Sequence, residues 1–285
     1  MRYKDMREIN SEKVADIVAN MCIMANCHIN PDIKNALIKS RETEESAVSR
    51  AVLDNLIENA AIAHRKEVPI CQDTGMAVFF VEVGQEVIVT GDTLTEAINK
   101  GVKIGYTEGY LRKSVVADPI HRVNTKDNTP AIIHYDFVKG DKIKITFAPK
   151  GFGSENKSAL KMLNPSDGID GVIDFVIDTV RRAGANPCPP MVVGVGIGGT
   201  MDKAACLAKK ALTRDITSSN ENEYYAELER KLLEKINLLG IGPQGMGGTT
   251  TALGVNIEVF PTHIAGLPVA VNINCHATRH RVEVI

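Results

Sequence analysis

The spacing of hydrophobic residues changes along this chain, and that change restricts the fold more than any other feature of the sequence. In the first quarter, apolar residues recur at intervals of three and four, which predicts helices over Ser11–Cys27, from Pro31 onward, and over Glu44–Lys66. From Met76 to Val83 a run of β-branched and aromatic residues predicts a strand instead. A helical N-terminal region therefore precedes a region that contains strands.

Two strand signals lie close together after this point. Ile132–Phe137 alternates apolar and polar residues, and so does Lys142–Phe147, with Lys139-Gly140-Asp141 between them. This pattern predicts a β-hairpin with one buried face. The residues expected on that face are Ile133, Tyr135, Phe137, Ile143, Ile145 and Phe147.

The remaining sequence mixes helices and strands. Helices are predicted over Val172–Ala183 and Met201–Leu212 and around Tyr225–Ile236, and strands over Met191–Val195, Gly254–Phe260 and Leu267–Ile273. Because strands and helices do not alternate regularly, we expect an α+β fold with mixed helices and mainly antiparallel strands. The 285 residues, 44% of them hydrophobic, suffice for one domain over 1–285, with possible sub-lobes divided near residues 165–190.

Charge and hydropathy exclude two classes of partner. Lys and Arg number 33 and Asp and Glu 35, which leaves a net charge of −2 and no basic field for nucleic acid. No apolar run approaches the ~18 residues that a membrane span requires, and the first 20 residues lack the apolar centre of a signal peptide. We therefore expect a cytoplasmic protein whose partners are small molecules or other proteins.

The six cysteines fall into two groups. Three follow helical patterns, where a free cysteine is usually a small buried hydrophobe: Cys22, Cys27 and Cys206. The other three lie in loops or at strand ends, beside prolines or polar residues: Cys71, Cys188 and Cys275. Three thiolates from distant loops suit an iron–sulfur cluster with one iron free of protein ligands, or a zinc site with one open position. The spacing alone leaves both open.

Two glycine-rich runs, 194–200 and 240–249, could either bring backbone N–H groups to an anion or allow tight packing of a strand against a helix. Gly194, Gly196 and Gly199 also fit the G-x-G-x-x-G pattern of dinucleotide-binding proteins. The second strand of such a unit is missing, because 213–223 is polar and leads into another helix. A dinucleotide-binding or zinc-binding module without turnover remains the alternative class of function.

Several segments carry a more specific signal. They are Cys71–Gly75, Leu111–Ser114, Lys150–Ser154, Asn186–Pro190, Gly194–Thr200, Gly242–Ala252 and Phe260–Cys275. In these segments, and in their order, the chain resembles the α subunit of the oxygen-sensitive class I fumarate hydratases and the closely similar L-tartrate dehydratases. The resemblance spans nearly the whole chain.

The resemblance implies a cofactor and a set of site residues. Three cysteines match the ligands of a [4Fe–4S] cluster whose fourth iron binds substrate: Cys71, Cys188 and Cys275. Positions that match contacts to a bound dicarboxylate are Gln72, Arg112, the backbone of Gly153, and His263. Asp73 matches a carboxylate that assists the catalytic base. The implied arrangement is two lobes around the iron–sulfur site.

The resemblance also implies an activity and a partner. The activity is the reversible hydration of fumarate to L-malate, a hydro-lyase step of the tricarboxylic acid cycle, with L-tartrate dehydration as the alternative. The catalytic base lies in the half of the family that this chain lacks, so a separate β subunit is expected. The resulting heteromer would be α2β2 or similar.

Overall fold

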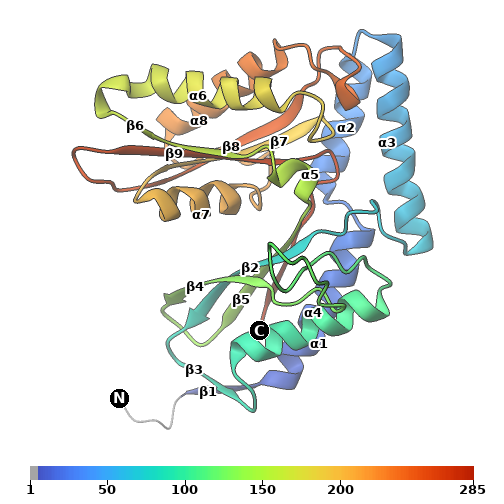
Figure 1. Cartoon of the computed structure of the whole chain (residues 1–285), viewed down its shortest axis with the longest axis vertical. Coiled ribbons are helices and arrows are strands. Elements are labelled where there is room, and N and C mark those ends of the chain that lie inside the picture. The colour runs from blue at the N-terminus through green and yellow to red at the C-terminus, as the bar shows by residue number, and fades with distance from the viewer. Residues whose placement is uncertain (1–5) are drawn as a thin grey trace. The chain divides into compact units, whose positions relative to one another are not determined.

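The computed structural model describes residues 6–285, which form two compact units (Figure 1). The first unit contains the chain up to Ile29 together with Ile62–Gly151 and Arg279–Ile285. The second contains Asn30–Ala61 and Phe152–Thr278. Each unit is therefore built from segments that are distant in sequence. The chain passes from one unit to the other after Ile29, Ala61, Gly151 and Thr278.

The helices of the N-terminal region lie close to their predicted positions. Helix α1 spans Ser11–Cys27 as expected, and α2 spans Pro31–Thr43. Helix α3 covers Ala47–Lys66, three residues shorter at its start than predicted, because Glu44 ends α2 and its carboxylate accepts hydrogen bonds elsewhere. No helix within residues 6–285 is long and apolar enough to cross a membrane.

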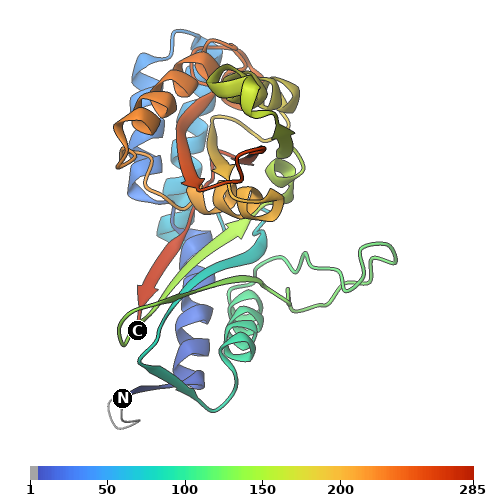
Figure 2. The same cartoon turned by 90° about the vertical axis from the view of Figure 1, so that its left-hand side faces the viewer.

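The first unit has two small sheets packed with helices. Its further elements are β1 (Arg7–Asn10), β2 (Met76–Gly84), β3 (Val87–Thr90), α4 (Leu94–Glu108), β4 (Ile132–Val138), β5 (Ile143–Lys150) and β10 (Arg281–Val284). Strands β1 and β3 pair in parallel, and a four-stranded sheet has the order β10-β5-β2-β4. Between α4 and β4 a long loop extends away from the helices and strands of this unit (Figure 2).

The predicted hairpin of β4 and β5 is wrong. Strand β2 lies between them, antiparallel to β5 and parallel to β4. Near the expected turn, backbone carbonyls pair with the end of β2 and not with each other's strand. Gly84 N–H donates to Lys142 O, and Gln85 N–H donates to Val138 O. On β5 the expected apolar face is buried, but β4 is an edge strand and Phe137 on it is 74% exposed.

The second unit is a mixed sheet covered on both faces. Its elements after α3 are α5 (Phe152–Glu155), β6 (Ala159–Leu163), α6 (Gly168–Ala183), β7 (Met191–Gly198), α7 (Met201–Ala211), α8 (Glu223–Asn237), β8 (Ala252–Phe260) and β9 (Leu267–Asn274). The strand order is β6-β9-β7-β8. Helices α6 and α8 cover one face of this sheet and α7 the other (Figure 1).

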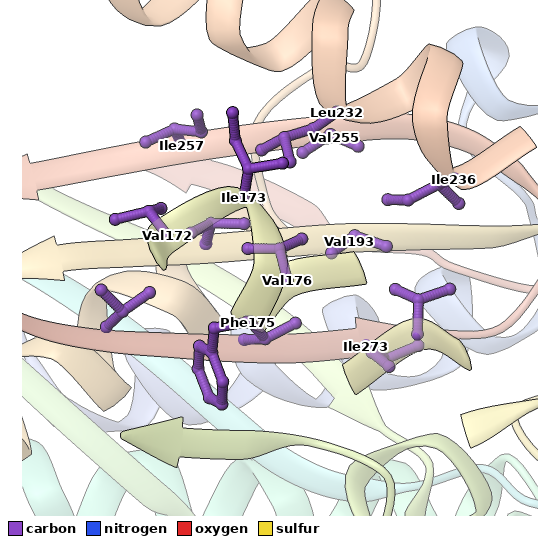
Figure 3. Packing of buried hydrophobic residues seen from close by; sticks show 14 of the residues in the cluster. Val172, Ile173, Phe175, Val176, Val193, Leu232, Ile236, Val255, Ile257 and Ile273 are labelled. Carbon is purple, nitrogen blue, oxygen red and sulfur yellow. The ribbon is translucent and has the colours of Figure 1, made fainter. Parts of the chain in front are cut away.

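The larger core of the second unit lies on the α6 and α8 face. Val172, Ile173, Phe175 and Val176 of α6 meet aliphatic side chains of the central strands, and Leu232 and Ile236 of α8 complete the layer (Figure 3). Strand β7 is buried along its whole length. The helices and strands predicted after Gly168 are therefore present, and their hydrophobic residues form this core.

The α+β class is confirmed, although the sheets are more mixed than expected. In residues 6–285, four strand pairings are antiparallel and three are parallel. The parallel pairs join β1 to β3, β2 to β4, and β7 to β8. They were not apparent from the sequence because each partner strand is distant in the chain.

The contact of β7 with α7 depends on glycine. A Cβ atom on Gly194 would lie 2.1 Å from Ala208 O, and one on Gly196 would lie 2.1 Å from Ala204 O. Both carbonyls belong to the helix backbone, so the contact cannot be relieved by a change of rotamer. We expect Gly196→Ala to lower the free energy of unfolding by about 1–3 kcal/mol.

Denaturant unfolding followed by circular dichroism measures this change. Gly266→Ala is the matched control, since the nearest atom to a Cβ there is 3.9 Å away. Equal midpoints for the two variants would contradict the packing role of Gly196.

Candidate active site

The loop before β2 carries Cys71, Gln72 and Asp73, and hydrogen bonds fix its shape. The Cys71 sulfur receives the Asp73 N–H at 3.4 Å and lies 3.2 Å from Gln72 Oε1. The sulfur thus has one backbone donor and one side-chain acceptor within hydrogen-bond distance. The thiol of Cys71 is half-buried and so accessible to a ligand.

The Asp73 carboxylate is also held in place. Its Oδ1 accepts the Gly75 N–H at 3.0 Å, and its Oδ2 lies over Gly151, where a Cβ atom would come within 3.2 Å of it. Gly75 has φ +76° and packs against the Lys150 backbone. Gly151 thus makes room for the carboxylate, and Gly75 donates a hydrogen bond to it.

Arg112 is joined to this loop through Thr74. The Thr74 hydroxyl accepts the Arg112 N–H at 2.9 Å and donates to Arg112 O at 3.2 Å. Tyr106, fully buried in α4, donates its hydroxyl proton to Thr74 O at 2.8 Å. Burial raises the pKa of Tyr106 well above its usual value, so the phenol remains a donor. The exposed Arg112 side chain therefore starts from a backbone fixed beside Asp73.

Arg279 is a site residue that the sequence analysis missed. Its side chain is only 6% exposed, and its guanidinium donates to Asp73 O at 3.0 Å and to Asn26 Oδ1 at 2.9 Å. The backbone carbonyl of Asn26 in turn accepts the Ile70 N–H. Two buried polar residues thus hold both sides of Cys71. The sequence signal for a buried polar partner was Asn26, a polar residue inside the apolar stripe of α1.

In the second unit, the structure brings Cys188 and Cys275 together. Strand β7 follows Cys188, β9 precedes Cys275, and the register pairs Val192 with Asn274, so both cysteines lie at the same end of the sheet. The His276 N–H donates to Cys188 O at 3.2 Å. Cys188 has φ +56°, a left-handed conformation that is uncommon for residues with a side chain and often marks functional sites.

The remaining cysteines differ from these three. Cys22 and Cys27 are buried, as predicted, and burial raises the pKa of each thiol. Cys206 is half-buried on α7. Cys71 and Cys275 are half-buried and Cys188 is exposed, each in a loop. None of the six cysteines, all of which lie within residues 6–285, forms a disulfide.

The loop cysteines fit an iron–sulfur cluster in their donor chemistry. Cys188 and Cys275 are adjacent, accessible thiols in the second unit, and Cys71 is an accessible thiol with an N–H donor in the first. Within residues 6–285, no group of three or more metal-ligating side chains is already assembled.

Gly153 and His263 occupy different places in the second unit. Gly153 is exposed in α5, and a Cβ on it would lie 3.9 Å from Asn186 O, next to the Cys188 loop. His263 is exposed in the connection from β8 to β9, where its Nδ1 accepts the Ala265 N–H. This connection meets Gly199 at the end of β7 opposite Cys188. Eight strand residues separate the two ends, or about 23 Å.

The two glycine-rich runs serve packing and an internal anion. Gly194 and Gly196 face α7, as described above, which accounts for the first run without a dinucleotide. In the second run, the Thr249 and Thr250 N–H groups and the Thr249 hydroxyl bind the buried Glu44 carboxylate. Backbone donors thus do meet an anion here, but the chain supplies the anion itself.

The pKa of Glu44 is below its usual value. Burial by itself would raise this pKa. Hydrogen bonds from the Ser46, Thr249 and Thr250 N–H groups and from the Thr249 hydroxyl lower it by more than burial raises it. A carboxylate with a depressed pKa stabilises the fold fully above its unfolded value, near 4.5, and loses that contribution as pH falls through the folded value.

We therefore expect Glu44→Gln to lower stability by about 2 kcal/mol at neutral pH, since hydrogen bonds to a charged group are lost. The difference from the wild type should shrink as pH falls below 4.5. Melting temperatures measured from pH 3 to 7 test this, with the exposed neighbour Glu45→Gln as control. A difference in melting temperature that does not change with pH would show that the charge of Glu44 does not stabilise the fold.

Comparisons with known proteins agree with the sequence motifs. The family model described as "Fumarate hydratase (Fumerase)" matches residues 15–283. A protein of Methanocaldococcus jannaschii named "Putative L(+)-tartrate dehydratase subunit alpha" is 45% identical over 277 residues, covering 95% of this chain and 97% of that protein. The "L(+)-tartrate dehydratase subunit alpha" of Escherichia coli (strain UTI89 / UPEC) is 35% identical over 271 residues, covering 94% and 89%.

Proposed function

Since this chain belongs to the fumarate hydratase (Fumerase) family, whose members are hydro-lyases, we propose that it is the α subunit of a hydro-lyase for a four-carbon dicarboxylate. The proposed reaction is the reversible hydration of fumarate to L-malate in the tricarboxylic acid cycle, in the cytoplasm. The observation that carries the proposal is that the loops of Cys188 and Cys275 lie side by side at one end of β7, joined by the hydrogen bond from His276 N–H to Cys188 O. Two relatives named as α subunits support a separate β subunit.

The proposed cofactor is a [4Fe–4S] cluster bound by Cys71, Cys188 and Cys275. When bound, it would supply an iron that acts as a Lewis acid toward the substrate hydroxyl. The described residues then have to hold the dicarboxylate and assist the base that removes the proton from carbon. Their polar contacts suit both tasks.

Arg112 binds one carboxylate of the substrate in this proposal. A guanidinium can make two parallel hydrogen bonds to a carboxylate, which fixes the orientation of the substrate as well as its position. Gln72 in the first unit and the backbone of Gly153 in the second unit provide uncharged hydrogen-bond donors. Because Thr74 fixes the Arg112 backbone, only the side chain loses conformational freedom on binding.

Asp73 assists the base that removes the proton from carbon. Its carboxylate is oriented by the Gly75 N–H and its backbone by Arg279. An oriented carboxylate can hydrogen-bond a neighbouring base and stabilise the cation formed when that base takes a proton. The base itself is proposed to come from the β subunit.

His263 completes the proposed substrate contacts, with one geometric condition. It lies in the connection at the end of β7 opposite Cys188, and this strand of eight residues spans about 23 Å, which exceeds the length of a four-carbon dicarboxylate. We therefore propose that a His263 in contact with a substrate at the cluster comes from a second copy of the chain. This arrangement implies an oligomer with two α chains, such as α2β2.

Dehydration of L(+)-tartrate is the second candidate, because both relatives described above carry that name. Fumarate and tartrate are both four-carbon dicarboxylates, so the same contacts serve either. Turnover of the reconstituted α and β chains on fumarate, L-malate and L(+)-tartrate decides between them. A strong preference for tartrate would replace the fumarate assignment.

Metal analysis after anaerobic purification tests the cofactor. We expect about four irons and four sulfides per chain. Cys71→Ser, Cys188→Ser and Cys275→Ser should each abolish the cluster, whereas Cys22→Ser, Cys27→Ser and Cys206→Ser should leave the iron content nearly unchanged. One zinc without sulfide would favour a zinc-binding module, and saturable NAD binding by the metal-free chain would favour a dinucleotide-binding one.

Kinetics of Asp73 and Arg112 variants test their separate roles. Arg112→Ala should raise KM and lower kcat/KM roughly 10²-fold, as expected when a charge-assisted pair is lost. Asp73→Asn should act mainly on kcat, because a carboxylate that supports proton removal matters most in the transition state. Both should keep the visible absorption of the cluster. A near-normal kcat in Asp73→Asn would make Asp73 a binding residue instead.

A further inference from the structure

We infer that Gln244, in the second glycine-rich run, is a positioning residue that holds the Cys188 loop against the Cys275 loop. The cluster role in this inference rests on the function proposed above. The Gln244 backbone N–H donates to Pro189 O at 2.8 Å, and its side-chain Nε2 donates to the same carbonyl at 2.8 Å. Both contacts are made to the residue that follows Cys188.

The same side chain reaches the second cysteine loop. Nε2 of Gln244 lies 3.1 Å from Nδ1 of His276, the residue after Cys275. An amide nitrogen carries two protons, so it can donate to Pro189 O and, in the tautomer with the imidazole proton on Nε2, to His276 Nδ1. In the other tautomer, Nδ1–H donates to Cys188 O, 3.1 Å away. The His276 backbone N–H then closes the connection by donating to Cys188 O. One side chain thus bridges the neighbours of both cysteines.

The loop that carries Gln244 is fixed independently of these contacts. Ser49 donates its hydroxyl proton to Gly247 O at 2.6 Å, and Glu44 binds the N–H groups that follow. A Cβ on Gly245 would lie 2.3 Å from the Cβ of Ala185, the residue whose carbonyl accepts the Cys188 N–H. The glycine-rich run is therefore packed directly against the Cys188 loop.

Gln244 adopts φ +52°, a conformation that favours glycine over residues with a side chain. A glycine would satisfy this backbone at lower conformational cost, but it could not make the bonds to Pro189 and His276. Metal ligands must be held within a few tenths of an ångström, and polar groups behind them supply that accuracy. Positioning of Cys188 and Cys275 gives a reason for a side chain at this left-handed residue.

Two variants separate the side chain from the backbone. Gln244→Gly removes the amide but suits the left-handed conformation, and Gln244→Glu keeps the shape but replaces the NH2 group, with both donor protons, by an acceptor oxygen. Met246→Glu is the matched control, because it places the same charge on an exposed residue of the same loop. Melting temperatures of the metal-free chains show whether each variant folds.

The first measurement is hydrogen exchange in the metal-free chain, which does not depend on a cofactor. We expect the His276 amide to exchange roughly 10-fold faster in both Gln244 variants, since one or two hydrogen bonds are lost, and to be unchanged in the control. Unchanged exchange in Gln244→Gly would overturn the inference that Gln244 joins the two loops.

The second measurement is iron retention after anaerobic reconstitution, followed by the visible absorption of the cluster during exposure to a chelator. Both Gln244 variants should lose iron roughly 10-fold faster than the control, at similar melting temperatures. Faster exchange with normal iron retention would overturn the role in the cluster. A wild-type chain that takes up no iron and sulfide would instead overturn the proposed function, while hydrogen exchange would still decide whether Gln244 joins the loops.

Discussion

The antiparallel register of β7 and β9 is the constraint on which the site in the second unit depends. Pairing of Val192 with Asn274 fixes the start of one strand beside the end of the other; Cys275 directly follows this pair, and Cys188 lies four residues before it. A shift of one residue would turn Val269, Val271 and Ile273 away from the α6 and α8 core and toward α7, so packing on both faces of the sheet enforces the register. The geometry of two cysteines is therefore secured by hydrophobic packing, with Gly194 and Gly196 admitting α7 to the other face of β7.

In the loops, hydrogen bonds from buried polar side chains fix the backbone. Tyr106 and Arg279 bind backbone carbonyls around Asp73, and Glu44 binds backbone N–H groups of the second glycine-rich run. Each satisfies groups that no helix or strand would pair, and an unpaired buried polar group costs about 1–3 kcal/mol. The loops that carry the site residues are consequently as well determined as the helices and strands that they connect.

The combination of a fixed strand register with loops held by buried polar side chains suits the chemistry of a hydro-lyase. A cluster with one iron free of protein ligands needs few protein donors, but those donors have to be rigid, while the substrate contacts need polar groups with accessible ends. In the proposed site, Cys188 and Cys275 would meet the first requirement through strand register and Gln244. Arg112 meets the second, because its backbone is fixed by Thr74 and its side chain is exposed.

The sequence by itself determined most of what depends on local spacing. Helix α1 has the predicted bounds, since its apolar residues recur at the helical period, and the residue motifs identified the family that the comparisons confirm. The pairing of β2 between β4 and β5 was missed, because Lys139-Gly140-Asp141 looks like a hairpin turn whether or not a third strand intervenes.

Only the tertiary structure decided what depends on contacts between residues far apart in the chain. Arg279 meets Asn26 across 253 positions, and Glu44 meets Thr249 across 205, so no window of sequence contains either pair. The glycine-rich runs have the composition of anion-binding loops, but packing against α7 and the internal Glu44 carboxylate settled their roles. Residue types fix which chemistry is possible, whereas the partner of each polar group is chosen when the chain folds.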